Sequence, residues 1–254
     1  MGTRDRQVQW QVADNPQMRR PVDRGTVRAR AADAHAVHVE VDGLRPGREY
    51  WYRFRVDGHL SPIGRTRTAP ARHEMPSALA MSFVSCSNWE AGFFTAYRYL
   101  ADDQPDLVLH LGDYQYEGKG KAAAVRTHAG DETVTLAGYR LRQSQYKTDP
   151  DLQLAHAIAP WLVVWDDHEV DNNWAAGVPQ DLKAPEWNDT PERFLARRAN
   201  AFRAYYENMP LRRSSIPNGS DMRIFRRLGW GRLANFHMLD TRQYRDDQAC
   251  GDGW

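Results

Sequence analysis

The chain has 254 residues, 34 of them Lys or Arg and 33 Asp or Glu, and 41% of its residues are apolar. The near balance of charge gives no broad basic face for nucleic acid or an anionic membrane, and no apolar run approaches the ~20 residues of a membrane span. The two cysteines, Cys86 and Cys250, are too few for the disulfide framework of a small secreted domain, and residues 1–6 have no apolar core behind them that would predict a signal peptide.

Residues 7–67 have an all-β pattern. Apolar and polar residues alternate with period two, and the apolar positions are aromatic or β-branched, which is typical of half-buried strands. The predicted strands are residues 8–12, 37–41 and 50–56. A turn-rich link at 42–47 separates the last two.

The pattern V-x-G-L-x-P-G-x-x-Y-x-Y-R-F across this region resembles the end of a fibronectin type III-like β-sandwich. We therefore expect a partial fibronectin III-like β domain over residues 1–69. Residues 70–78 contain two prolines and no apolar period, so they predict a linker. From residue 79 to 254 the sequence pattern instead predicts alternating strands and helices.

This second region predicts strand–helix–strand units and hence a right-handed parallel sheet with flanking helices, an α/β fold. The expected strands are 79–84, 107–109 and 160–165, and the expected helices are 93–100, 135–146, 149–158 and 190–209. Two later strands, 222–225 and 233–239, are predicted with a turn at 229–231.

Each of the three apolar strands ends in side chains that can bind a metal ion. Cys86 follows the first strand, Asp113 and then Tyr116 follow the second, and Asp167 and His168 follow the third. Because ligands bind at the carboxyl ends of strands in open α/β sheets, we expect Cys86, Asp113, Tyr116 and Asp167 to converge.

The donor types indicate the kind of cation. Carboxylates and a tyrosinate favour hard cations, and a thiolate in the same set argues against a pure calcium or magnesium site. Cys, Tyr and Asp together suit a ferric ion, with a second cation that shares the Asp. Two adjacent metals commonly run phosphoester hydrolysis through a metal-bound water or hydroxide. His168 is placed to stabilise the charged transition state or protonate the leaving oxygen.

Other interpretations of single residues stay open on spacing alone. Tyr116 fits a core or rim tyrosine, and Cys86 fits a small buried hydrophobe. Asp167 and His168 fit a helix N-cap and a packed histidine. His110 faces the interior of its strand and is predicted to be structural.

Four motifs in order resemble a known family: F-V-S-C-S-N, H-L-G-D-Y-x-Y-E, W-D-D-H-E-V-x-N-N and L-D-T-R-Q-Y-R. They are similar to the PhoD-type alkaline phosphatases and phosphodiesterases of the calcineurin-like metallophosphoesterase superfamily. The resemblance covers nearly the whole chain, and it implies that residues 79–254 are the N-terminal part of a metallophosphoesterase catalytic domain. It also implies small phosphoester substrates, mono- or diesters, without a preference between them.

The resemblance implies a role for each site residue. Cys86, Asp113 and Tyr116 would hold Fe3+, and Ca2+ beside it would share Asp113. The superfamily motif G-N-H-[DE] aligns with residues 166–169, so Asp167 maps to a metal ligand and His168 to the catalytic group.

Further residues near these motifs have open roles. Asn172 or Asn173 is a candidate for one more ligand, without a choice between them. Arg242 and Arg245 are candidates for holding phosphate, and surface salt bridges explain them equally well.

The resemblance also sets expectations for the whole protein. Family members are exported, so an extracellular or periplasmic location is expected, and no oligomeric state follows. A later Gly-Asp-x-His type motif of the superfamily is missing after Asp240, so the chain resembles a fragment that is truncated at both ends. We expect weak metal retention and little turnover from it alone. The alternative function is a non-catalytic binding module with a degenerate phosphoesterase scaffold, which would be colourless and free of iron.

Overall fold

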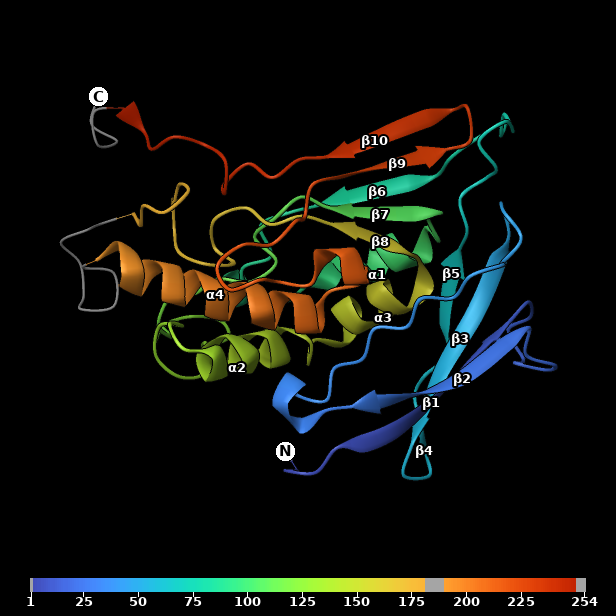
Figure 1. The fold of residues 1–254 in the computed structure, drawn as a ribbon, viewed down its shortest axis with the longest axis horizontal. Coiled ribbons are helices and arrows are strands. Elements are labelled where there is room, and N and C mark those ends of the chain that lie inside the picture. Colours follow the sequence, from blue (N-terminus) through green and yellow to red (C-terminus); the bar gives the residue numbers. More distant parts are fainter. Residues whose placement is uncertain (1, 181–189, 250–254) are drawn as a thin grey trace.

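The computed structural model describes residues 2–180 and 190–249, and Cys250 lies outside them. Two main sheets organise the described residues, and a two-stranded hairpin, β9 (Arg226–Trp230) with β10 (Ala234–Met238), forms a third sheet (Figure 1). One main sheet comes from the first 67 residues, and the other belongs to a strand-and-helix region that follows. Among the described residues, no helix is both long enough and apolar enough to cross a lipid bilayer.

The N-terminal sheet is antiparallel, with strand order β2-β1-β3-β4 and β5 paired with β3. Its register brings Gly25 opposite Trp10, where a Cβ atom would lie 2.7 Å from the indole ring. The described residues of this region form one sheet, so the fibronectin III-like sandwich stays a prediction. The strands are β1 (Arg6–Ala13), β2 (Asp23–Ala29), β3 (Glu49–Val56), β4 (His59–Leu60) and β5 (Gly64–Arg67), and a short 3-10 helix η1 (Ala31–Asp33) follows β2.

The strand predicted at residues 37–41 is wrong, because this segment runs without strand pairing. Its alternating polar side chains instead contact the second region. His38 bonds through Nδ1 to the carbonyl of Leu211 at 2.9 Å, and its ring stacks on Tyr206 with centroids 4.2 Å apart. Glu40 accepts a hydrogen bond from the backbone N–H of Arg213 at 2.9 Å. Alternation here therefore reflects docking between regions.

The second region contains the predicted parallel sheet, in the order β6-β7-β8. Its helices begin where capping residues stand: the side chains of Thr135, Asp149 and Thr190 each accept a backbone N–H of the first turn. The elements are β6 (Met81–Val84), η2 (Trp89–Ala91), α1 (Thr95–Asp102), β7 (Leu107–His110), α2 (Leu136–Tyr146), α3 (Pro150–Ile158), β8 (Trp161–Val163), α4 (Pro191–Asn208) and η3 (Arg213–Ser215).

The helices lie together on one side of this sheet (Figure 1). Val108 and Val163 are fully buried on that face, and His110 is buried with them between the rings of Tyr114 and Trp161. The other face is open to solvent at β6, where Phe83 is 70% exposed. His110 therefore lies in the core, as the sequence predicts.

The last two strands form an antiparallel hairpin, β9 (Arg226–Trp230) and β10 (Ala234–Met238). The predicted strand at 222–225 is wrong: Met222 and Ile224 are buried, but their backbone pairs with no strand among the described residues. The turn occupies residues 231–233 and not 229–231. Gly231 has φ +55 and lies against the carbonyl of Glu74, so the turn forms where only glycine fits.

Candidate metal centre

The loops that follow β6 and β7 are joined by backbone hydrogen bonds. The N–H of Cys86 donates to the carbonyl of Gly112 at 3.1 Å, and that of Ser87 donates to the carbonyl of Asp113 at 2.8 Å. Since β6 and β7 are neighbouring parallel strands, these bonds extend their alignment past the sheet edge. Cys86 and Asp113 are thereby brought side by side.

The loop that follows β8 contacts the end of β7 just as closely. Gly112 has φ +117, and a Cβ atom there would lie 2.3 Å from the backbone nitrogen of Asp166. Real Cβ atoms do not approach that closely, so glycine is required at this position. Its absence of a side chain lets the Asp113 and Asp167 loops meet.

Both Cys86 and Asp113 have left-handed backbone conformations, with φ +59 and +55. Residues other than glycine adopt this region at a cost, and such strain clusters at functional sites. Two such residues occupy the ends of adjacent strands, and both carry metal-competent side chains. The backbone thus holds these two donors in place against its own local preference.

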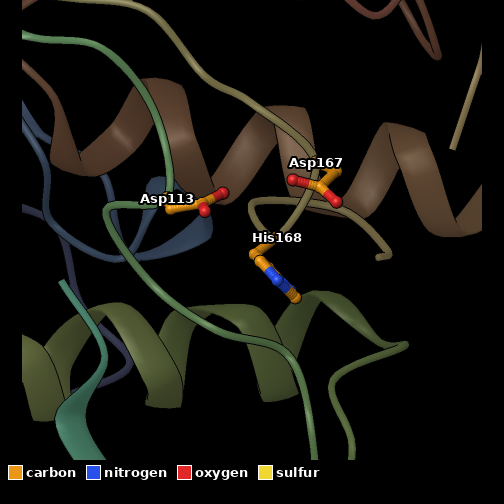
Figure 2. A group of neighbouring side chains, drawn as sticks. All are labelled: Asp113, Asp167 and His168. Carbon is orange, nitrogen blue, oxygen red and sulfur yellow. The ribbon is translucent and has the colours of Figure 1, made fainter. Parts of the chain in front are cut away.

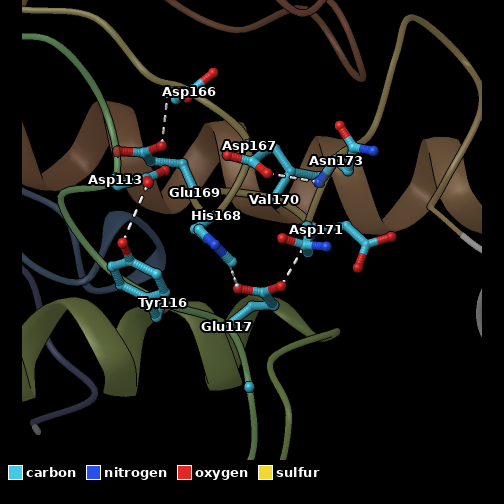
Figure 3. A network of polar contacts seen from close by, with 12 residues as sticks. Asp113, Tyr116, Glu117, Asp166, Asp167, His168, Glu169, Val170, Asp171 and Asn173 are labelled. Atoms are coloured by element: carbon cyan, nitrogen blue, oxygen red, sulfur yellow. Dashed lines mark hydrogen bonds and ion pairs between the residues drawn. The ribbon is translucent and has the colours of Figure 1, made fainter. Parts of the chain in front are cut away.

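Asp113 is the shared centre of the site. Its Oδ2 accepts a hydrogen bond from the Tyr116 hydroxyl at 3.2 Å, as Figure 3 shows. Its Oδ1 is buried and has no hydrogen-bond partner among the described residues. A buried carboxylate oxygen without a partner is costly, unless a cation takes the position.

Asp113 also belongs to a group with Asp167 and His168, as Figure 2 shows, and the ring of His168 lies against that of Tyr116 with centroids 4.0 Å apart. One ligand atom from each of the three lies within 4.8 Å of the others. Asp113 therefore lies next to both pairs of donors, Cys86 with Tyr116 and Asp167 with His168. This layout fits two cations that share one carboxylate.

Asp167 is held as an anion. Burial opposes its ionisation, but the N–H of Asn173, 2.6 Å from its Oδ2, and the guanidinium of Arg242, 3.4 Å from its Oδ1, outweigh burial and lower its pKa. Arg242 also pairs with Asp166 at 2.7 Å. Arg242 itself is buried, and it also lies near the buried Asp167, so it is part of the centre.

His168 is oriented by a carboxylate that the sequence did not single out. Its Nδ1 lies 2.7 Å from Oε2 of Glu117, whose Oε1 accepts the N–H of Asn172 at 2.8 Å (Figure 3). Burial would lower the pKa of His168, but the hydrogen bond and charge of Glu117, with the charges of Asp167 and Asp113, raise it to about 9. His168 is therefore a cation at neutral pH.

The raised pKa values of Asp113 and Glu169 show that several negative charges lie close together at this site. Burial, with the charges of Asp167 and Asp166 against that of His168, raises the pKa of Asp113. Burial and the charge of Asp113 raise the pKa of Glu169 to about 8, although Glu169 accepts backbone N–H groups of Tyr114 and Asp166. A bound cation would favour the anionic forms and relieve this repulsion.

The Cys86 thiol and the Tyr116 phenol also need a nearby cation to lose their protons and act as ligands. A hydrogen bond from Ser85 favours the thiolate of Cys86, but burial and the charge of Asp113 raise its pKa. Burial and the charges of Asp113 and Cys86 raise the pKa of Tyr116 far above its usual range. Thiolate and phenolate are the forms that bind metals, and a ferric ion would supply the charge that produces them.

The structure thus groups Asp113, Asp167 and His168, places Tyr116 against Asp113 and His168, and brings the exposed Cys86 beside Asp113 and Tyr116. It adds Glu117 and Glu169, and their places inside two of the four motifs were the only sequence signal for them. The backbone of Asn173, and not that of Asn172, contacts Asp167. Arg245 makes a described contact only with a backbone carbonyl of its neighbour Asp246.

Comparisons with known proteins identify the family of this chain. Residues 79–254 match the PhoD-like phosphatase family, and residues 1–70 match the PhoD-like phosphatase N-terminal domain. The chain is 49% identical over 251 residues to alkaline phosphatase D of Bacillus subtilis (strain 168), which covers 97% of this chain and 42% of that protein. A solved structure described as that of PhoD matches with a TM-score of 0.92 and 48% identity over 100% of this chain and 48% of its own. The chain spans less than half the length of these relatives.

Proposed function

This chain belongs to the PhoD-like phosphatase family, and we propose that its metal centre takes part in the hydrolysis of phosphate mono- or diesters. The family resemblance of the sequence is thereby confirmed, together with a phosphoesterase-like α/β fold. The observation that carries the proposal is the position of Asp113. Its carboxylate lies next to the Cys86 and Tyr116 donors and to the Asp167 and His168 donors, and one of its oxygens is buried without a partner in residues 2–180 and 190–249.

The donor set supports Fe3+ at Cys86, Asp113 and Tyr116, with Ca2+ beside it at Asp113 and Asp167. Cations bound there would polarise the phosphoryl oxygens and lower the pKa of a coordinated water. The side chains that surround them are anionic or can become so, which suits high positive charge. The choice of these two metals follows from donor chemistry and from the family.

The protein's own groups have separate tasks. The hydrogen bond with Glu117 favours the protonated form of His168, which lies beside both carboxylates and could donate its proton to the leaving oxygen. Glu117 fixes the orientation of its ring through the 2.7 Å contact at Nδ1. Arg242 offsets the charge of Asp166 and Asp167 and keeps their loop in place.

The wider setting is also a proposal. The division into residues 1–69, a linker at 70–78 and residues 79–254 is supported by the change from one sheet to the next. Small phosphoesters as substrates and an extracellular or periplasmic location are supported by the similarity to alkaline phosphatase D. The fibronectin III-like character of the first region rests on its sequence pattern alone.

The test begins with colour, because ferric thiolate and phenolate centres absorb visible light. We expect the chain supplied with Fe3+ and Ca2+ to become coloured and to lose that absorption in Cys86→Ser and Tyr116→Phe. Tyr99→Phe, at an exposed tyrosine of α1, is the matched control and should keep it. Elemental analysis should show that Asp113→Asn retains less of both metals.

Hydrolysis of a monoester and a diester is then measured on the same preparations. We expect whatever turnover the metal-loaded chain has to be abolished in Asp113→Asn. A colourless preparation that gains no activity from added iron and calcium would instead favour the non-catalytic binding module. Equal metal content in the chain and in Asp113→Asn would also contradict the proposal.

A further inference from the structure

A cavity of about 330 Å³ opens beside the metal centre, between the loop after β6 and the start of α1. Cys86 lines it, so the cavity begins at the residue that also faces Asp113 and Tyr116. Its volume falls in the range of small-molecule sites. The rest of its wall is mostly apolar: Val84, Ala91, Phe93, Phe94 and Ala96.

Phe93 makes this cavity different from a chance depression. Its side chain is 71% exposed, although the neighbouring Phe94 is buried in the core. An exposed aromatic ring is ordinary by itself, but this one borders a concave apolar surface that adjoins polar ligand groups. Apolar walls with a few convergent polar groups are typical of substrate pockets.

The wall that carries Phe93 is rigid. The guanidinium of Arg126 lies over the rings of Trp89, Phe93 and Phe94, with its carbon 3.7, 5.0 and 4.5 Å from their centroids. The same group pairs with Asp149 at 2.6 Å, and both side chains are shielded from solvent. Because the charge is paired and the rings are stacked, the cavity exists before any ligand arrives.

The floor is fixed as well. The hydroxyl of Tyr97 lies 2.6 Å from that of Ser87, directly after Cys86 in the chain. Asn88 accepts the N–H of Glu90 at 2.9 Å and so caps the short helix η2. The hydrogen bond between Ser87 and Tyr97 thus holds the loop after β6 to α1 without covering the apolar wall of the cavity.

We propose that this cavity receives an apolar alkyl or aryl substituent of the phosphoester whose phosphoryl group lies at Asp113. This inference rests on the proposed function and adds a substrate class to it, esters with a compact apolar group. Cys86 lines the cavity and neighbours Asp113, so a phosphoryl group bound at Asp113 would present its ester oxygen toward this cavity. Esters with only small polar substituents would leave the apolar wall wet and bind more weakly.

Thiol labelling tests the cavity without metal or turnover. The metal-free chain is treated with N-phenylmaleimide or N-methylmaleimide, and mass spectrometry follows Cys86 and Cys250 separately. We expect the phenyl-to-methyl rate ratio to be at least tenfold higher at Cys86 than at Cys250. Ala96→Trp should fill the cavity and abolish that preference, whereas Tyr99→Trp on the same helix should keep it. Equal ratios at the two cysteines would overturn the proposal.

Phosphonate binding to the metal-loaded chain separates this inference from the proposed function. We expect phenylphosphonate to bind at least tenfold more tightly than methylphosphonate, and Phe93→Ser to reduce the difference severalfold. If both phosphonates bind equally, the apolar subsite is refuted and the phosphoryl site stands. If neither binds, the proposed function fails, and the maleimide ratios still decide whether the cavity selects apolar groups.

Discussion

Gly112→Ala should separate the two loops that meet at the metal centre. The added Cβ would lie 2.3 Å from the nitrogen and 2.5 Å from the Cβ of Asp166. Nonbonded atoms touch at about 3.5 Å, so the β8 loop would have to retreat by roughly 1 Å. That retreat moves Asp167 away from Asp113, because Asp167 follows Asp166 directly.

The cost has two parts. An alanine at φ +117 is strained by about 1–3 kcal/mol, and overpacking against backbone adds about 1–3 kcal/mol. For a chain of this size each kcal/mol lowers Tm by about 2–4 °C, so the combined loss of about 2–6 kcal/mol corresponds to roughly 4–24 °C.

Thermal unfolding with and without Ca2+ measures both effects. Gly43→Ala is the control for strain alone, because Gly43 has φ +74 and nothing within 4 Å of its Cβ position. Gly118→Ala, with open space and no positive φ, is the control for substitution as such. We expect Gly112→Ala to melt below both variants and to lose the stabilisation by Ca2+. Melting within a degree of Gly43→Ala, with the calcium effect intact, would refute the close-contact reasoning.

Three further outcomes are expected. Since the pKa of His168 is raised to about 9, its contribution to folding stability is complete below pH ~6.5 and is lost as pH rises through 9. Glu117→Gln should lower that pKa in an NMR titration of the metal-free chain. An unchanged pKa would contradict Glu117 as the partner of His168. Arg126→Met should cost about 3–5 kcal/mol in urea unfolding, because it leaves Asp149 buried and unpaired; a loss below 1 kcal/mol would count against this pair. Thr190→Ala should cost about 1 kcal/mol, since it removes the N-cap of α4, and Thr190→Ser should restore most of it.

The sequence was informative wherever local pattern decides structure. Apolar runs with polar ends predicted β6, β7 and β8, and the family motifs added the roles of Asp113 and Asp167. The segment at 37–41 shows the limit, because period two also arises when alternate side chains dock on another region, as His38 and Glu40 do.

Contacts between residues far apart in the sequence could not be predicted, because local patterns carry no information about them. Glu117 and His168 are 51 residues apart, and nothing in the spacing of either motif predicts their contact. Arg242 lies 76 residues from Asp166, so its burial in the centre could not be separated from a surface ion pair before the fold was known. Such pairs follow from the three-dimensional meeting of loops.

The left-handed backbone at Cys86 and Asp113 lowers thermal stability at the two positions whose side chains are needed to bind cations. Glycine at either position would relax a conformational cost of about 1–3 kcal/mol while deleting a donor atom. A randomised library screened for heat tolerance alone should accumulate glycine at these two positions, and the survivors should be sturdier and unable to retain iron.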